Sequence, residues 1–165
     1  MYLVGNEHRA QKNVQLYKEA IADWQKQQKF TLFGTCSFKH NSYLGREDRI
    51  KAYKRFWNAV DRQIHTAKAV QKYNRRIERF VFEEEGKSRQ FLHSHFFCKA
   101  ESAKQLKHII NATQHFWNER VDTADKLYID LNTVRDWREG YGIKEYRLGS
   151  DEQLLVECCY LREQS

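Results

Sequence analysis

The stretch Phe91-Leu92-His93-Ser94-His95-Phe96-Phe97 places two histidines two residues apart inside an apolar run. This spacing matches the period of a β-strand, in which every second side chain points to the same face of the sheet. His93 and His95 are therefore predicted to project together. Neutral imidazole is a common ligand for divalent transition metals, so the pair predicts one side of a metal site.

An acidic segment, Glu83-Glu84-Glu85, ends the strand pattern that precedes the histidines. Residues 77–84 and 90–99 are expected to form an antiparallel hairpin around a glycine-containing turn. A turn of even length brings Glu84 onto the histidine face, whereas an odd length brings its two neighbours there, because a shift of one residue exchanges the faces. Glu84 is the predicted third ligand of a site for Mn²⁺ or Mg²⁺, and the mixed nitrogen and oxygen donors suit Mn²⁺ better.

The rest of the chain alternates between helical and strand periods. Helices are predicted at about residues 7–28, 46–69, 102–117 and 132–144, and strands at residues 30–38, 77–84, 90–99, 126–131 and 153–161. An α+β fold is therefore expected, with one five-stranded, largely antiparallel sheet and helices packed on it. Gly34 inside the first strand predicts a β-bulge or a close approach by another backbone.

The composition indicates one folded domain with an anionic partner. The 165 residues are 41% hydrophobic and 14% aromatic, and the absence of proline excludes a proline-rich linker. A single domain is expected over residues 1–165, with an N-terminal helix at 1–29 and a core at 30–161. The net charge of +7 favours nucleic acid as the partner, ahead of an acidic membrane surface.

The cysteines and the hydropathy pattern indicate where in the cell the protein is expected. Neither a membrane-spanning segment nor a signal peptide is recognisable, so no membrane partner is expected. Cys36, Cys98, Cys158 and Cys159 have no Cys-x-x-Cys spacing, and three of them lie in apolar runs. This pattern predicts reduced, mostly buried thiols in an intracellular protein.

Three short motifs occur in a fixed order along the chain. The first is the apolar strand Phe30-Thr31-Leu32-Phe33, the second is the pair His93 and His95, and the third is Tyr-x-x-Lys at Tyr141 and Lys144. Together they resemble the HUH endonuclease superfamily, in its branch of rolling-circle replication initiators (Rep proteins). In Rep proteins the tyrosine follows the histidines, as it does here, whereas in relaxases it precedes them. The resemblance covers residues 30 to 146, with a departure at residue 94, where the family usually has a hydrophobic residue and this chain has serine.

The resemblance implies a fold, an activity and partners. The fold would be the ferredoxin-like or RRM-like palm of the superfamily. The activity would be a metal-dependent, sequence-specific nicking of single-stranded DNA at an origin stem-loop, which leaves a 5′-phosphotyrosine and a free 3′-OH. Partners would include the replication machinery or a helicase of the host, in a bacterial cytoplasm or a eukaryotic nucleus.

The same residues can be argued from their chemistry. Tyr141 would supply the phenolate nucleophile, whose ordinary pKa is about 10 and which therefore needs help from a cation. Lys144 lies one helical turn away and would favour the charged form. Gly140 and Gly142 would leave room for a nucleotide backbone or allow Tyr141 to move. A polar loop provides further candidate contacts to nucleic acid, namely Lys39, His40, Asn41 and Tyr43.

Several rival readings are compatible with the sequence. Tyr128 and Tyr146 are alternative nucleophiles, but neither has a lysine three residues later. A non-catalytic nucleic-acid-binding module could instead stack bases on aromatic residues of the sheet, namely Phe80, Phe82, Phe91 and Phe97. A metal-independent RNA-cleaving enzyme that uses His93 or His95 as general base is the third possibility.

Overall fold

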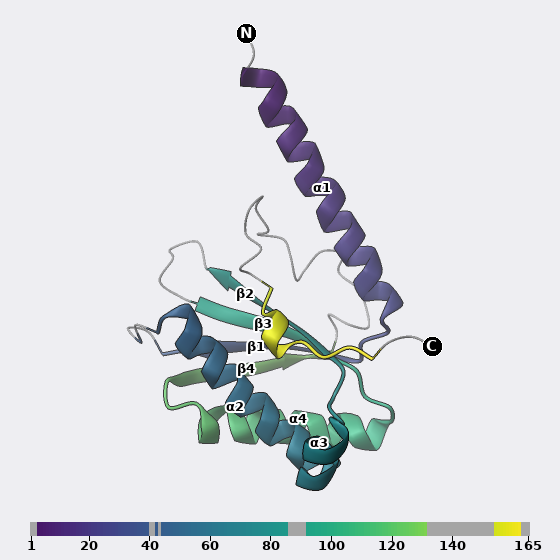
Figure 1. Ribbon diagram of the computed structural model, residues 1–165, viewed down its shortest axis with the longest axis vertical. Coiled ribbons are helices and arrows are strands. Elements are labelled where there is room, and N and C mark those ends of the chain that lie inside the picture. Colours follow the sequence, from purple (N-terminus) through teal and green to yellow (C-terminus); the bar gives the residue numbers. More distant parts are fainter. Residues whose placement is uncertain (1–2, 40–41, 43, 86–91, 132–153, 163–165) are drawn as a thin grey trace.

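A computed structural model describes residues 3–39, 42, 44–85, 92–131 and 154–162 (Figure 1). Its helices are α1 (Leu3–Gln27), α2 (Arg46–His65), α3 (Ala67–Tyr73) and α4 (Ala103–Arg120), and its strands are β1 (Leu32–Phe38), β2 (Arg79–Glu85), β3 (Leu92–Cys98) and β4 (Ala124–Asp130). The strands form one antiparallel sheet in the order β2-β3-β1-β4. The predicted α+β class is confirmed.

The predicted fifth strand at residues 153–161 is wrong for the part of it that the structure describes. Leu154 and Tyr160 form only isolated bridges to β2, and a 3₁₀ turn at Val156–Cys158 separates them. This turn buries Leu155 and Cys158 in the core, which a regular strand beside β2 would not do for both. Burial of these two side chains therefore outweighs continuous pairing with the sheet edge.

The single helix predicted at residues 46–69 is in fact two helices. Thr66 has a φ of 70°, which no α-helical residue adopts, and it separates α2 from α3. Its hydroxyl accepts a hydrogen bond from the backbone N–H of Ala69 and so caps α3. The left-handed conformation of Asn74 ends α3, where the helical pattern in the sequence also breaks.

One face of the sheet is covered by α2 and α4, with α3 beside them (Figure 1). The helices contribute large aromatic side chains to this core, including Tyr53, Trp57 and Trp117, which are almost fully buried. The strands contribute Leu32, Cys36, Phe38, Val81, Phe96 and Cys98. Within the described residues, no helix is both long and apolar enough to span a bilayer.

Gly34 makes room for an aromatic ring on this covered face. Gly34 pairs with Phe96 on β3, and a Cβ atom added at Gly34 would fall within the van der Waals radius of the Phe96 ring. The close approach predicted at Gly34 is thus made by a side chain and not by a backbone. The bulge lies farther along β1, between Cys36 and Phe38, where the pairing with β4 shifts.

A layer of phenylalanines lies on the opposite face of the sheet. It consists of Phe30, Phe33, Phe80, Phe82 and Phe97, all of them buried. Trp24, near the C-terminal end of α1, packs edge-on against Phe80 with ring centroids 5.1 Å apart. The rest of α1 extends away from the sheet (Figure 1). This helix therefore contacts the core mainly through its last turns.

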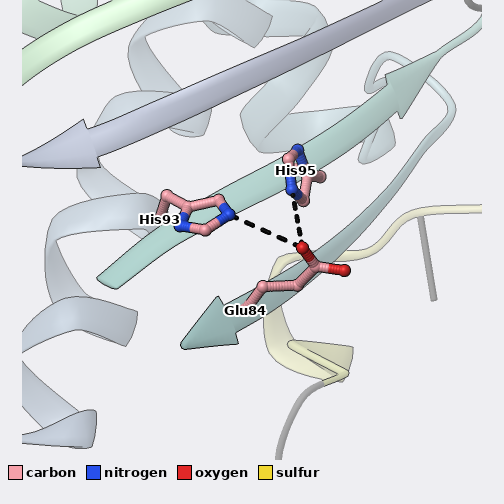
Figure 2. A group of neighbouring side chains, drawn as sticks. All are labelled: Glu84, His93 and His95. Atoms are coloured by element: carbon pink, nitrogen blue, oxygen red, sulfur yellow. Dashed lines mark hydrogen bonds and ion pairs between the residues drawn. The ribbon is translucent and has the colours of Figure 1, made fainter. Parts of the chain in front are cut away.

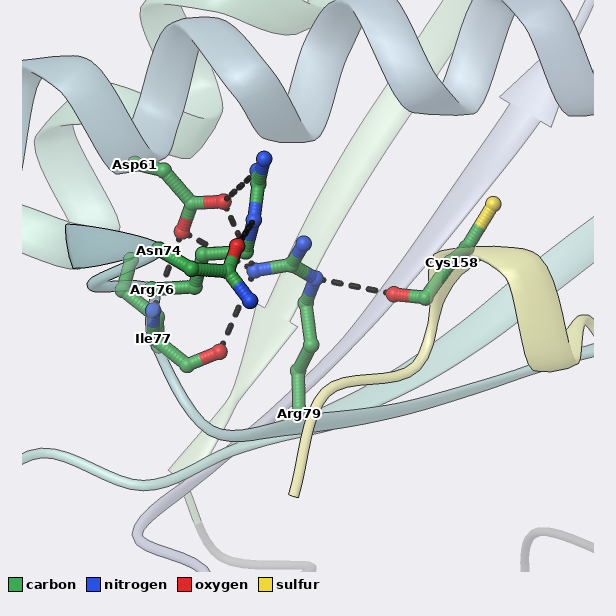
Figure 3. Close-up of polar contacts among 6 residues, drawn as sticks. All are labelled: Asp61, Asn74, Arg76, Ile77, Arg79 and Cys158. Carbon is green, nitrogen blue, oxygen red and sulfur yellow. Dashed lines mark hydrogen bonds and ion pairs between the residues drawn. The ribbon is translucent and has the colours of Figure 1, made fainter. Parts of the chain in front are cut away.

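A buried ionic network ties α2 to β2 and to the 3₁₀ turn (Figure 3). Asp61 is fully buried and accepts hydrogen bonds from Arg76 at 3.0 Å, from Arg79 at 2.9 Å and from the backbone N–H of Ile77 at 3.0 Å. Arg79 also donates to the carbonyl of Cys158 at 2.9 Å. Because the partners come from α2, from the connection before β2, from β2 itself and from the 3₁₀ turn, the network fixes where β2 begins relative to the helix layer.

Candidate metal centre

The β2–β3 hairpin positions the candidate ligands through its register. Glu84 pairs with His93, and Phe82 pairs with His95, so Glu84, His93 and His95 lie on one face of the sheet. The face predicted for Glu84 is confirmed, because the register corresponds to a turn of even length. These side chains share the face with the phenylalanine layer and lie opposite the helices.

The three side chains converge on a common point (Figure 2). Oε2 of Glu84 lies 3.2 Å from Nε2 of His95 and 3.5 Å from Nε2 of His93. One donor atom from each residue lies within 4.8 Å of the other two. The imidazole rings stand nearly perpendicular, at 86°, so both Nε2 atoms point toward the carboxylate without the rings colliding. The group therefore has the donor arrangement of a metal site.

Burial and charge prepare Glu84 to accept a cation. Burial raises the pKa of this carboxyl, but hydrogen bonds and charge interactions with His93 and His95 outweigh that effect and lower its pKa from 4.5 to about 2. Glu84 is therefore ionised at neutral pH. Its second oxygen, Oε1, is buried and has no hydrogen-bond partner among the described residues. A buried acceptor without a donor is costly, and a bound cation would satisfy it.

The three ligands differ in their access to solvent. Glu84 is 3% exposed and His95 is 5% exposed, whereas the side chain of His93 is 25% exposed. Among these three residues, His93 is the one that solvent reaches, so a substrate would approach an ion held by them from its side. Open positions beside protein ligands are what a catalytic metal needs in order to bind a substrate oxygen.

His95 is held in place by its neighbours on β1 and β2. Thr35 is its pairing partner on β1, and the Thr35 hydroxyl lies 2.9 Å from Nδ1 of the ring. Phe33 stacks on the imidazole at a centroid distance of 5.3 Å and an angle of 20°, and Phe82 contacts it at 5.2 Å. When Nε2 binds a metal, Nδ1 carries the proton, and the Thr35 hydroxyl can accept a hydrogen bond from this N–H group. Thr35 is thus a supporting residue that the sequence analysis missed.

The neighbouring glutamate has a different partner. Glu83 points to the helix side of the sheet, where Arg49 of α2 binds it with two contacts of 2.8 and 3.1 Å. Arg49 also donates to the carbonyl of Leu44 at 2.7 Å. Glu83 is therefore committed to a nearly buried ion pair on the far face, which removes it from the predicted metal site.

The fit to a divalent ion follows from the donor set. Two imidazole nitrogens and one carboxylate suit a transition metal such as Mn²⁺, because Mg²⁺ prefers oxygen ligands. The four cysteines are free and do not belong to the group, and burial raises the pKa of Cys36, Cys98 and Cys158. These thiols are accordingly poor ligands at neutral pH.

The other predicted site residues are placed only in part. Tyr141 and Lys144, the predicted nucleophile and its cation, lie outside the described residues, as do His40, Asn41 and Tyr43. Lys39 is exposed at the end of β1, and its ammonium donates to the carbonyl of Asp122 at 3.3 Å. Their predicted roles therefore stay predictions.

The phenylalanines predicted to form a base-stacking surface in the rival binding module are largely buried. Phe80, Phe82 and Phe97 are each at least 92% buried and pack among themselves and against Trp24. Bases cannot stack on rings that are covered by other side chains. Phe91, the fourth ring of that prediction, lies outside the described residues.

Two observed features bear on function: the antiparallel sheet, and the Glu84, His93 and His95 group on the face opposite α2 and α4. Both agree with what the resemblance to HUH endonucleases implies, but neither is confined to that superfamily. No protein-family model matches this sequence, and no curated protein is significantly similar to it.

Proposed function

We propose that this protein is a metal-dependent, single-stranded DNA endonuclease and strand transferase that nicks a replication origin by tyrosine transesterification. The observation that carries the proposal is the convergence of Nε2 of His93 and Nε2 of His95 on one oxygen of Glu84, across two paired strands. Two features of the sequence support the proposal further. The three motifs occur in the order expected for Rep proteins, and the net charge of +7 favours a polyanionic substrate.

The proposed reaction exchanges one phosphate ester for another. The phenolate oxygen of Tyr141 attacks the phosphorus, the bond from phosphorus to the 3′ oxygen breaks, and that oxygen takes up a proton to become a free 3′-OH. Lys144 would stabilise the phenolate beforehand. When bound, a divalent ion supplies Lewis acidity at the scissile phosphate. The phosphate diester is conserved as a tyrosyl ester, so the reverse reaction can rejoin strands.

Glu84, His93 and His95 would act as positioning ligands. The two buried members, Glu84 and His95, would fix the ion against the sheet, and the more exposed His93 would lie on the side from which the phosphate arrives. The DNA would leave Nδ1 of His95 untouched, because Thr35 and the phenylalanine layer enclose that edge of the ring.

The decisive test is a search for the covalent intermediate. The protein is mixed with a pool of single-stranded DNA oligonucleotides and Mn²⁺, and the products are separated on a denaturing gel. Wild type should give a slower protein–DNA band, and both Tyr141→Phe and an excess of EDTA should abolish it. Tyr146→Phe is the matched control, because it removes a nearby tyrosine that lacks the lysine three residues later.

The outcomes separate the rival readings. A band that persists in Tyr141→Phe would show that another tyrosine is the nucleophile. The absence of any band, together with tight binding that EDTA does not change, would favour a non-catalytic binding module. Cleavage of RNA in EDTA that depends on His93 or His95 would favour the metal-independent nuclease.

A further inference from the structure

Glu84, His93 and His95, here called the metal group, lie on a face of the sheet that continues to the opposite edge at β4. Thr35 of β1 pairs with His95 on one side and with Tyr128 of β4 on the other. Directly paired residues point to the same face of a sheet, so His95, Thr35 and Tyr128 form one row. Adjacent strands lie about 4.8 Å apart, so Tyr128 begins about 10 Å from His95, two strand spacings away.

A second row runs beside the first. Ser37 pairs with His93, and its hydroxyl accepts a hydrogen bond from the backbone N–H of Lys126 at 3.2 Å. Lys126 stands two residues before Tyr128 on the same edge strand. The two rows together define a strip from His93 to β4, made of His93, Thr35, Ser37, Lys126 and Tyr128.

Among the residues of this face that the structure describes, those of the strip are the more accessible to solvent. Tyr128 is 65% exposed and Lys126 is also exposed, while Thr35 and Ser37 are half-buried. On the other side of the metal group, Phe33 and Phe82 are buried and block access to His95. A ligand that approaches the group from the side of His93 can therefore lie along the strip, with its far end over β4.

The chemistry of the strip matches a single-stranded nucleic acid. An exposed tyrosine ring stacks on a base of any sequence, and a lysine amine near it binds a phosphate. Asp125 also lies at this edge, and its carboxylate accepts a hydrogen bond from Ser37 at 3.4 Å, so the strip has no large excess of positive charge. The exposed ring therefore distinguishes this surface more than its charge does.

We propose that the strip is the docking path of the single-stranded DNA substrate, with one base stacked on Tyr128 and an adjacent phosphate on Lys126. This inference rests on the proposed function, because the DNA is taken to continue from Tyr128 to a phosphate at the metal group. It assigns Tyr128 a binding role through its ring, and its hydroxyl takes no part in the chemistry.

The test measures binding separately from cleavage. Fluorescence anisotropy of labelled, mixed-sequence single-stranded DNA is recorded in EDTA with wild type, Tyr128→Ala, Tyr128→Phe and Tyr73→Ala. Tyr73 on α3 is the matched control, because it is also 65% exposed but belongs to the helix layer on the other face of the sheet. Tyr128→Ala should weaken binding by about 5- to 150-fold, the equivalent of one stacked base, and Tyr128→Phe should restore it.

Two further measurements are the salt dependence of DNA affinity and the yield of the covalent protein–DNA product. Lys126→Ala should make the dependence of affinity on salt concentration shallower by about one phosphate contact. Loss of binding in Tyr128→Ala supports the strip even if wild type forms no covalent product, in which case only the proposed function fails. Equal affinities of Tyr128→Ala and Tyr73→Ala, or no binding of DNA by wild type, would overturn the docking path. If wild type formed the covalent product and Tyr128→Phe bound DNA normally but formed none, the docking path would stand, but Tyr128 would be the nucleophile and its assignment to binding alone would be wrong.

Discussion

At the scale of single residues, the contact between Thr35 and His95 gives the sharpest prediction. The Thr35 hydroxyl can donate a hydrogen bond to an unprotonated Nδ1 of His95 or accept one from a protonated Nδ1. It can therefore hold the imidazole both without and with a metal. Thr35→Val keeps the shape of the side chain but removes this contact, and it should weaken Mn²⁺ binding by about 10- to 100-fold in a calorimetric titration.

Two variants control for this experiment. Thr35→Ser retains the hydroxyl and should bind Mn²⁺ nearly as well as wild type. Ser37→Ala removes the neighbouring hydroxyl, which contacts Asp125 and Lys126, and should also leave the affinity nearly unchanged. Full affinity in a folded Thr35→Val protein would show that the stacked phenylalanine alone orients His95.

The candidate ligand residues could be predicted from the sequence because their signal is local. The spacing of His93 and His95 and the distance from Glu84 to the turn depend only on the two-residue period of a strand and on the parity of one hairpin. Thr35 and Tyr128 could not be found in this way. Their places follow from the pairing of β1 with two strands that are distant in the sequence, and no local pattern specifies that register.

At the scale of elements, the buried carboxylate of α2 gives a prediction about stability. Asp61→Asn would leave the buried Arg79 guanidinium without its counter-charge, and it should lower the free energy of unfolding by about 3–5 kcal/mol. Asp48→Asn on the same helix is the control, because Asp48 is exposed and its contact to Lys51 is long, at 3.7 Å. Asp48→Asn should lower the free energy of unfolding by less than about 1 kcal/mol.

Urea unfolding measures both variants. The midpoint should fall for Asp61→Asn with little change in the dependence on urea, because the surface exposed on unfolding stays the same. Equal midpoints for the two variants would mean that the network around Arg79 is not what joins α2 to β2.

The errors in predicting elements have physical causes. Thr66 ends α2 although threonine is not a strong helix breaker, and only its positive φ in the folded chain reveals the break. The apolar run around Leu154, Leu155 and Val156 has the composition of a strand, but short apolar runs do not distinguish a strand from another buried segment. In the C-terminal segment, the burial of Leu155 and Cys158 in the core decided the conformation.

At the scale of the whole molecule, the metal group should make stability depend on pH. The pKa of Glu84 is about 2 in the folded chain and about 4.5 when unfolded, so its contribution is fully present above pH 4.5 and is lost as the pH falls toward 2. In metal-free protein, the difference in unfolding free energy between wild type and Glu84→Gln should therefore shrink over this interval. The change should be on the order of 3 kcal/mol.

Chemical unfolding at a series of pH values measures this difference, and Mn²⁺ provides a second arm. At neutral pH the ion should raise the melting temperature of wild type but not of Glu84→Gln, because a ligand that binds only the folded state stabilises it. A constant difference between the two proteins from pH 4.5 to pH 2 would contradict the charge assigned to Glu84.

Because one hairpin supplies all three candidate ligands, a bound metal would also act on how the strands align during folding. Glu84 comes from β2 and the histidines come from β3, and a slip of one residue between these strands would turn Glu84 toward Arg49 and the helices. An ion that requires all three side chains binds only the correctly aligned hairpin. Metal binding would then stabilise the correct pairing of β2 with β3 over the pairing that is shifted by one residue, before any substrate binds.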